Sequence, residues 1–466
     1  MPRYVGAASL LATLALLSGC TSDQPLPLAS NQAKASPVRT PILSLATGQH
    51  GAPRSWVNLT GPMQPAFEQA VKAAGGTIER RHPEINAVTI TGLSSAGVAA
   101  LAARADVEHI GPDLKVQWVP TLPQAERGRI QLTGHRAPGS GQFDQSGAYF
   151  FDHYQWNMKK IRAPEGWART PAGLGVEVCV LDTGIDPGHI DLQGRVDLEH
   201  STSFVESEPF IEDLDFHGTF VSTLISSNGL GIASVAPGAT LCMVKVLDQT
   251  GSGSFGDMVA GMLYAAELGV DVINMSLGAL LDLSDPDQRA LFQALNRVAN
   301  FVNRRGVLIV AAAGNDGLNL DRSGRTKNVP SQLDNVVSVG ATGPINQQNF
   351  DRLASYSNYG RTGVDIVAPG GEYIENQTVL EDLIMSACSE FVCGDVDFYV
   401  FADGTSFSAP HAAGAAAVIE SNYRRDQRPG LLGACLEIGA DNIGPAVFFG
   451  HGRVDVPREA RCNATW

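Results

Sequence analysis

The amino-acid sequence predicts an α/β protein with a parallel sheet sandwiched by helices, preceded by a small α+β domain. Two observations predict this. From about residue 151 to residue 466, apolar stretches typical of strands alternate with helical stretches, as in a parallel sheet covered on both faces. Between residues 54 and 119, strand-like and helical stretches alternate within only about sixty-five residues, so this domain would be marginally stable alone. We expect it to pack on something larger.

The first twenty residues predict export. Arg3 precedes an apolar run, Val5–Leu17, which is too short for a permanent membrane helix and is typical of a signal segment. The run ends in Leu-Ser-Gly-Cys, which resembles the lipobox of bacterial lipoproteins and makes Cys20 the predicted lipidation site. The alternative is an ordinary secretory signal with an unrelated cysteine, and it also predicts export.

Two further segments have the composition of loops. Residues 21–53 are rich in Ser, Pro, Ala, Gln and Thr and predict a flexible linker. Residues 120–150 contain Arg127 and Arg129 among Gly, Ser and Gln, and they predict an exposed processing loop that a protease can nick.

The small domain, residues 54–119, has the pattern of a ferredoxin-like motif. Ser94 or Ser95 is the predicted cap of its second helix. With one more strand between Gly76 and Ile90, the order approaches β-α-β-β-α-β. The expected elements are strands at 55–59, 87–90, 107–110 and 114–119, and helices at 64–74 and 94–105.

The large domain, residues 151–466, begins its sheet with an almost continuous apolar strand at 175–181, as expected for a central parallel strand. A last helix follows Ser406. The other expected elements are strands at 240–247, 270–277, 307–313, 336–339 and 364–368, and helices at 256–268 and 286–305.

Three chemically useful side chains fall where these elements end or begin. Asp182 follows the first strand, Asn315 follows the strand at 307–313, and His217 stands at a predicted helix start. Ligands of parallel sheets bind beyond the carboxyl ends of the strands. There a carboxylate can orient an imidazole, a neutral histidine can accept a hydroxyl proton, and an amide can donate to an oxyanion.

Ser406 precedes an Ala-rich run of high helix propensity, with Pro410 near the first turn. We therefore place Ser406 at a helix N-terminus, where free N–H groups and the helix dipole favour negative charge. Each candidate alone also fits a simpler role: Ser406 as a cap, His217 as a structural histidine, and the other two in turns. Their joint occurrence favours catalysis.

The segments that contain these residues resemble the four sequence blocks of the subtilisin-like serine proteases, in that family's order Asp, His, Asn, Ser. The matching segments are 178–185, 217–219, 312–315 and 404–414. Residues 155–164 also resemble the start of a mature protease of this family, 450–455 its closing turn, and 54–119 its inhibitory propeptide.

The resemblance implies that Ser406 is the nucleophile, His217 the general base and then acid, and Asp182 the orienting carboxylate. The Asn315 amide and the Ser406 N–H would form the oxyanion hole. The segments implied to line the substrate groove and its main specificity pocket are Ser276, Leu277 and Gly278, and Ala311, Ala312, Ala313 and Gly314.

The sequence departs from the family pattern at several positions. Phe220 replaces a second histidine outside the triad, and Phe407 stands where methionine is usual. Residues 279–281, Ala-Leu-Leu, replace a Gly-rich continuation and change the edge of the pocket. None of these changes removes a catalytic group.

The cysteines fit an exported enzyme. Cys388 with Cys393, and Cys435 with Cys462, are predicted to form disulfides in an oxidising compartment, with free thiols as the alternative. Cys179 and Cys242 lie in apolar strands, and we expect them to be free thiols. No Cys/His cluster has metal-ligand spacing. No cofactor is assigned with certainty: structural calcium is common in the family, but no loop is dense enough in carboxylates to place a site.

The formal net charge of −15, with 17% charged residues, argues against nucleic acid as a partner. The expected partners are protein or peptide substrates, the chain's own propeptide as an intramolecular inhibitor, and a membrane through the lipid anchor before processing. The sequence thus predicts an autoprocessed endopeptidase, exported as a bacterial lipoprotein to the outer membrane or cell surface, which cleavage between residues 120 and 154 can release.

Two alternatives stay open. One is a lipoprotein with this fold that binds peptides or partners without catalysis, against which the intact set of four site residues argues. The other is a protease that cuts only its own prosegment.

Overall fold

A computed structural model describes residues 43–48, 51–119, 143–423 and 428–462 of the chain. The signal segment with Cys20, most of the expected linker, and the part of the processing loop at 120–142 lie outside the described residues. Within the described ranges, no helix is both long and apolar enough to cross a membrane.

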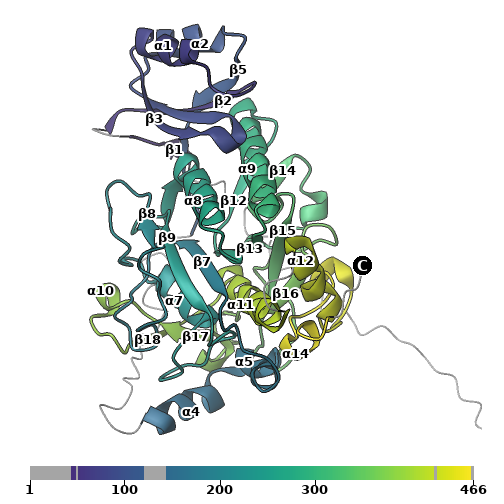
Figure 1. Ribbon diagram of the computed structural model, residues 1–466. Helices are drawn as coiled ribbons and strands as arrows, with labels where there is room; N and C mark the ends of the chain where they lie inside the picture. The colour runs from purple at the N-terminus through teal and green to yellow at the C-terminus, as the bar shows by residue number, and fades with distance from the viewer. Residues whose placement is uncertain (1–42, 49–50, 120–142, 424–427, 463–466) are drawn as a thin grey trace, which may run out of the picture. The chain divides into compact units, whose positions relative to one another are not determined.

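The large domain is built on a seven-stranded sheet in which all neighbouring strands are parallel, in the order β16-β15-β13-β11-β7-β9-β8 (Figure 1). The predicted parallel sheet is confirmed. Its strands are β7 (Glu177–Asp182), β8 (Thr202–Ser203), β9 (Thr240–Lys245), β11 (Val272–Met275), β13 (Leu308–Ala312), β15 (Val336–Thr342) and β16 (Ile366–Pro369).

Alternating side chains of the central strands β7, β9, β11 and β13 supply two cores, one on each face of the sheet. In β7, Val178 and Val180 belong to one cluster, and Cys179 and Leu181 belong to the other. This alternation follows from the period of two in a strand, and it explains why the strand is apolar throughout.

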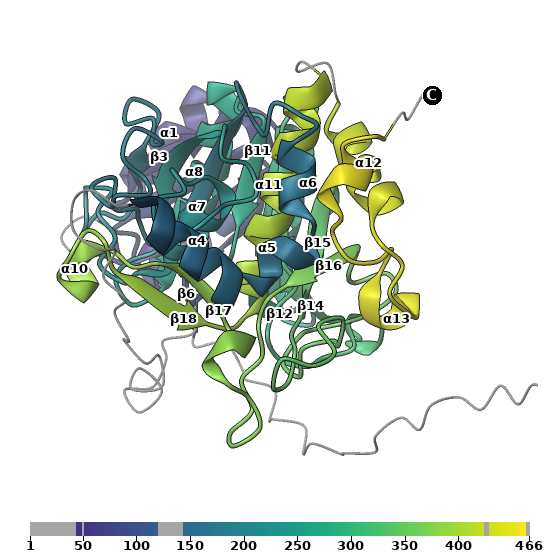
Figure 2. The same cartoon turned by 90° about the horizontal axis from the view of Figure 1, so that it is seen from below.

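Helices α7 (His217–Ile225), α11 (Thr405–Tyr423) and α12 (Pro429–Gly439) contribute to the first core. The second core includes α8 (Phe255–Leu268) and α9 (Pro286–Arg304). Figure 2 shows α11 with the C-terminal helices beside it. The remaining helices are α4 (Phe143–His153), α5 (Trp156–Lys160), α6 (Ala163–Trp167), α10 (Glu390–Cys393), α13 (Ala446–Phe449) and α14 (Val456–Glu459), with 3-10 turns η2 (Pro83–Ile85), η3 (Leu320–Arg322) and η4 (Leu380–Asp382).

The small domain has the expected β-α-β-β-α-β order. The strand that the sequence left unplaced is β3, and Ser94 caps the second helix through the N–H of Gly97. Its antiparallel sheet has the order β3-β4-β2-β5. The elements are β2 (Arg54–Leu59), α1 (Pro65–Ala73), β3 (Thr77–His82), β4 (Ala87–Thr91), α2 (Ser95–Ala102) and β5 (Val107–Pro112).

Three short strands join the two domains. Strand β6 (Leu114–Gln117) pairs on one side with β1 (Leu43–Leu45) and on the other with β10 (Ser252–Ser254), both antiparallel. The prediction that residues 21–53 are entirely linker is therefore wrong at 43–45, because the backbone of these three residues pairs with the edge of β6.

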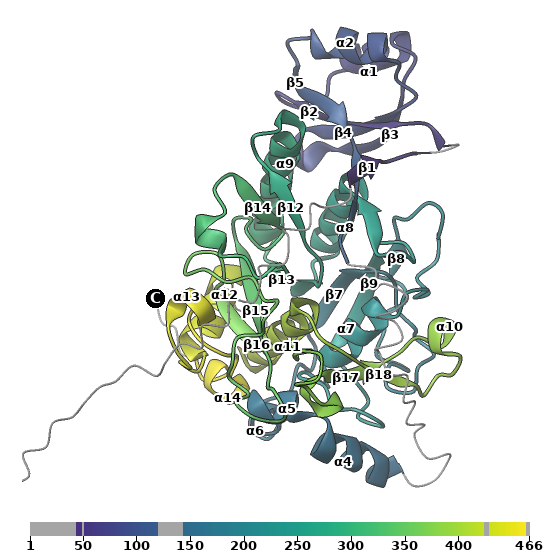
Figure 3. The same cartoon turned by 180° about the vertical axis from the view of Figure 1, so that it is seen from behind.

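Other segments also differ from expectation. Residues 143–150 of the expected processing loop belong to helix α4. The sequence analysis did not predict two antiparallel pairs: β12 (Ala279–Asp282) with β14 (Thr326–Val329), and β17 (Ile384–Ala387) with β18 (Tyr399–Ala402) (Figure 3). The first pair joins segments that are far apart in the chain, and the second is formed by two consecutive short strands.

The structure contains disulfides between Cys388 and Cys393 and between Cys435 and Cys462. The expectation of free thiols at Cys179 and Cys242 is wrong, because these two residues form a third disulfide. They are register partners on the adjacent parallel strands β7 and β9, with Cα atoms 4.5 Å apart. That separation is within the range that a disulfide spans.

We predict that a Cys179→Ala/Cys242→Ala double variant loses about 2–4 kcal/mol of unfolding free energy, because the disulfide no longer restricts the unfolded chain. Urea unfolding of the variant and the wild type measures the loss. Peptide mapping without reduction should recover the two cysteines in one linked fragment, and alkylated Cys179 in such a digest would contradict the disulfide.

Candidate active site

The candidate residues gather at the carboxyl edge of the sheet, around β7. Asp182 is the last residue of β7, and Ser276 directly follows the neighbouring strand β11. Asn315 follows β13, the next strand along. Strand β7 pairs with β9 on one side and with β11 on the other, so the strand order changes direction here, where open α/β sheets bind ligands.

Asp182 and His217 are joined by a hydrogen bond. The Nδ1 atom of His217 lies 2.8 Å from Oδ1 of Asp182, which also accepts the N–H of Thr183. Asp182 is fully buried and His217 nearly so. We assign the proton to Nδ1, because the carboxylate can only accept. This tautomer leaves Nε2 as an unprotonated base.

The environment raises the pKa of His217. Burial lowers this pKa, but the charge and hydrogen bond of Asp182, with the charges of Asp215 and Asp213, outweigh burial and bring it above 6.5. Burial and the charge of Asp213 in turn raise the pKa of Asp215 to about 7. The imidazole is therefore a stronger base than an isolated one, as a group that accepts a hydroxyl proton needs to be.

Asp213 holds the start of α7, a role that the sequence analysis missed. Its carboxylate accepts the hydroxyl of Thr183 and the N–H groups of Phe216 and Thr219. Phe216, just before His217, has a left-handed backbone with φ of 99°. Asp213 thus ties the end of β7 to the turn that presents His217; the only signal in the sequence was an aspartate four residues before the histidine.

Gly218 permits the close approach of these two elements. A Cβ atom at this position would overlap the carbonyl oxygen of Gly184, just beyond β7. Since Asp182 and His217 each lie next to this contact, a side chain here would force them apart.

Ser406 is the second residue of α11, so the expectation of a helix N-terminus agrees with the structure. Pro410 has no N–H and cannot bond the carbonyl of Ser406 four residues earlier. That carbonyl accepts the hydroxyl of Ser276 instead, at 2.7 Å. The first turn of α11 is thereby attached to the segment after β11.

Aromatic packing links Ser406 to the histidine. The ring of Phe407 lies 5.6 Å from the imidazole of His217 and 4.3 Å from the ring of Phe220, centre to centre. The two departures from the family pattern therefore fill one site together. The Nε2 atom of His217 is buried and has no hydrogen-bond partner among the described residues, Ser406 included.

Asn315 is exposed at the same edge. Its side-chain oxygen accepts the N–H and the hydroxyl of Thr405, the residue before Ser406. Because the oxygen is engaged, the Nδ2 group is the end of the amide that remains to donate. An amide fixed in this way beside a helix N-terminus can stabilise an oxyanion without reorganising.

The segments expected to line the groove are only partly exposed. Ser276 and Leu277 are buried, as are Ala311, Ala312 and Ala313. Gly278 donates its N–H to the carbonyl of Trp118 at 3.2 Å. A buried side chain that the sequence analysis missed, Asn328, lies beside both Gly278 and Gly314 and donates to Ser331. A specificity pocket between the two segments, as the resemblance implies, would therefore have a polar neighbour.

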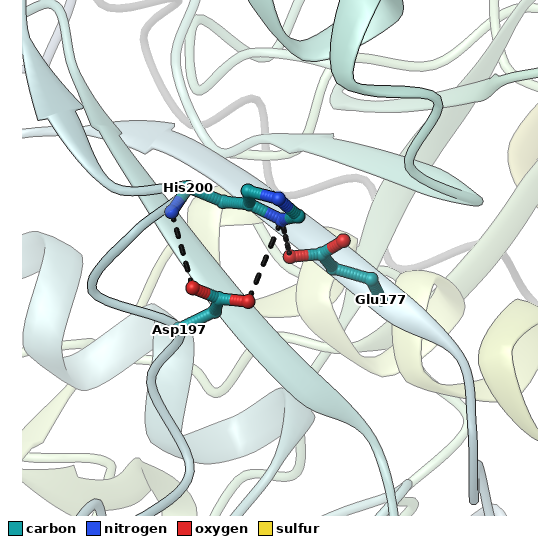
Figure 4. A group of neighbouring side chains, drawn as sticks. All are labelled: Glu177, Asp197 and His200. Atoms are coloured by element: carbon teal, nitrogen blue, oxygen red, sulfur yellow. Dashed lines mark hydrogen bonds and ion pairs between the residues drawn. The ribbon is translucent and has the colours of Figure 1, made fainter.

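Among the described residues, one group of acidic and histidine side chains could ligate a metal ion. Glu177, Asp197 and His200 place one ligand atom each within 4.8 Å of the others (Figure 4). Nδ1 of His200 lies 2.8 Å from Glu177 and 3.5 Å from Asp197, and the bond to Glu177 raises the histidine pKa. These ion pairs account for the cluster, and Glu177 begins the strand that Asp182 ends.

Comparisons with a family model and with known relatives indicate the same protein family. Residues 173–433 match the model of the subtilase family, peptidase S8. A thermophilic serine proteinase of Bacillus sp. (strain AK1) is 33% identical over 310 residues, which are 66% of this chain and 67% of the relative. Subtilisin Savinase of Lederbergia lenta is 37% identical over 308 residues, 66% of this chain and 98% of the relative.

The fold is also that of solved proteases. The crystal structure of the epidermin leader peptide processing serine protease from Staphylococcus aureus superimposes with a TM-score of 0.71 at 23% identity, covering 89% of this chain and 99% of that one. At this identity the likeness concerns the fold alone. Together with the sequence matches, it shows that the chain belongs to the subtilase family and is a subtilisin-like serine protease.

Proposed function

We propose that the chain is an exported serine endopeptidase, made as a zymogen, whose triad is Asp182, His217 and Ser406. The observation that carries the proposal is the buried hydrogen bond between Asp182 and His217 beside the helix start that holds Ser406. A protein that only binds peptides has no need of a histidine prepared as a base.

Each group has a role in acyl transfer. The Oγ atom of Ser406 attacks the substrate carbonyl carbon while Nε2 of His217 takes its proton. The Asn315 amide and the Ser406 N–H hold the oxyanion. The peptide C–N bond then breaks, and the imidazolium returns the proton to the leaving amine. Water, deprotonated by the same imidazole, hydrolyses the acyl-enzyme and frees Ser406.

The pairing of the segment before the processing region supports inhibition by this part of the chain. Residues 114–117 pair with β10, and the carbonyl of Trp118 accepts the N–H of Gly278. The side chain of Trp118 is buried against Phe255 with ring centres 5.0 Å apart. We infer that residues 54–119 inhibit the enzyme by filling its groove, and that cleavage between residues 120 and 154 separates them from it.

The export proposal rests on the sequence of the first twenty residues. Lipidation at Cys20 would anchor the precursor to a membrane, and cleavage after residue 119 would release the enzyme, because the anchor lies on the propeptide side. The disulfides agree with an oxidising compartment.

The first prediction of this proposal concerns Ser406. We expect the exported wild-type protein to shorten to a species that starts between residues 120 and 154 and to digest casein, and Ser406→Ala to do neither, because it has no nucleophile. Mass spectrometry and a casein assay measure both. Ser408→Ala, two residues further along the same helix, is the matched control and should process normally.

Other outcomes separate the alternatives. If the wild type and Ser406→Ala both stay full-length and inert, the chain is a binding protein. If the wild type shortens but casein survives, it is a protease restricted to its own prosegment or to few substrates.

The second prediction concerns pH. Because neutral His217 is the active form and its pKa is raised, kcat/KM should be full at higher pH and fall as the pH drops through a midpoint above 6.5. Asp182→Asn removes the charge that raises this pKa, so the midpoint should move to lower pH. The same change should lower kcat by up to about 10⁴-fold, since the imidazole loses its orienting carboxylate. An unmoved midpoint in Asp182→Asn would contradict the assignment.

The third prediction concerns the oxyanion. Asn315→Leu should lower kcat by about 10²- to 10³-fold, equivalent to ~3–4 kcal/mol, with little change in KM, since the donor acts on charge that develops in the transition state. This is the range that loss of such a donor costs in subtilisin. Steady-state kinetics on a chromogenic peptide measures both constants. A raised KM with unchanged kcat would place Asn315 in ground-state binding instead.

A further inference from the structure

A lysine of the groove-filling segment forms an ion pair that the catalytic machinery does not use. Nζ of Lys115, on β6, lies 2.5 Å from Oδ2 of Asp248. Asp248 lies beyond the end of β9, in the turn that leads into β10. The pair therefore joins the segment in the groove to the strand edge on which that segment lies.

The carboxylate of Asp248 is held in place by its own turn. Its Oδ1 atom accepts the N–H and the hydroxyl of Thr250, at 2.8 and 2.6 Å, while its backbone N–H donates to Ser252. The second oxygen is left to face Lys115. The side chain of Asp248 is only 10% exposed, and that of Lys115 is 41% exposed. The carboxylate of Asp248 is thus a fixed and largely buried acceptor for the partly exposed ammonium group of Lys115.

The charge of Asp248 is stable near neutral pH. Burial raises its pKa, but the hydrogen bonds from Lys115 and Thr250 outweigh burial and lower it. A cavity of about 360 Å³ borders the pair, and its lining includes Glu206 and also Asp257, which pairs with Arg54 of the small domain. The cavity gives an arginine side chain space beside the lysine position.

The backbone fixes where this contact falls along a bound peptide. Ser254 is the register partner of Lys115, and Ser252 is that of Gln117. The N–H groups of Trp118 and Val119 both donate to the carbonyl of Gly251. Consider a substrate strand that pairs with β10 in this register. Its residue at the position of Lys115, three before the position of Trp118, can reach the carboxylate of Asp248 with its side chain.

We propose that Asp248 is a specificity-determining residue that selects lysine or arginine at one position of the substrate. This position corresponds to Lys115 of the prosegment, three residues before Trp118, whose carbonyl accepts the Gly278 N–H. The inference rests on the proposed endopeptidase function and names a feature of its substrates. The prosegment occupies this subsite with Lys115, and a basic substrate side chain occupies it after the prosegment has left.

The experiment uses the processed wild-type enzyme and three synthetic peptides. The peptides span residues 112–130 of the chain: the natural sequence, Lys115→Gln and Lys115→Arg. We expect Lys115→Gln to lower kcat/KM about two- to fivefold at low salt, the range of a partly exposed ion pair, and Lys115→Arg to keep it near the natural value. The difference should shrink in 0.5 M NaCl, a readout that packing alone would not move.

The enzyme variant Asp248→Asn keeps an oxygen for Thr250 and loses the charge. It should cleave the natural and Lys115→Gln peptides at nearly the same rate. Asp334→Asn is the matched control, because Asp334 is exposed just before β15. It lies at the amino ends of the strands, whereas Asp248 lies beyond their carboxyl ends. The control variant should discriminate between the peptides as the wild type does.

The outcomes are distinguishable. Equal rates on all three peptides by a wild type that digests casein would overturn the subsite and leave the protease function standing. Discrimination that survives in Asp248→Asn would overturn the role of this residue. No hydrolysis of casein or of any peptide would overturn the endopeptidase function, and with it the inference that rests on it.

Discussion

The proposed active site depends on one contact, the approach of the first turn of α7 to the end of β7. Asp182 belongs to the strand and His217 to the helix, and their 2.8 Å hydrogen bond exists only while the two backbones meet. Gly218 allows that approach, and Asp213 fixes it by accepting bonds from both sides. A bond of this length tolerates little displacement, so residues that never touch a substrate set the basicity of the imidazole.

The sequence predicted the parts of the site that depend on local pattern. Strand β7 was visible as an apolar run, and α11 as an Ala-rich helix after Ser406. The missed parts depend on contacts between distant segments. Asp213 acts through Thr183, thirty positions away, and the Cys179–Cys242 disulfide depends on β7 and β9 being neighbours across 63 positions. Strand adjacency of this kind follows from the order of the sheet, which periodicity does not encode.

The substitutions Phe220 and Phe407 show why single departures from a family pattern are hard to interpret. Each alone puts a bulky ring at a site next to the proposed triad, and together they pack with ring centres 4.3 Å apart. Neighbouring residues of this kind are energetically coupled, so the effect of one change is not defined without the other. Phe407 of this pair also lies 5.6 Å from the imidazole of His217, centre to centre, so the pair supports the imidazole as well as filling space.

The zymogen proposal requires a segment that fills the groove and still leaves it. Arg54 of the small domain is buried between Asp113 and Asp257, at 2.9 and 3.3 Å, and Asp257 belongs to α8 of the large domain. For buried ion pairs the cost of desolvation offsets most of the Coulomb attraction, so they fix position more than they add affinity. After the chain is cut, the segment loses the high effective concentration that the covalent link provided. When it leaves, Asp257 and Asp248 of the large domain lose Arg54 and Lys115 and are hydrated again. Ionic contacts at this boundary therefore fix the register of the segment more than they add to its affinity.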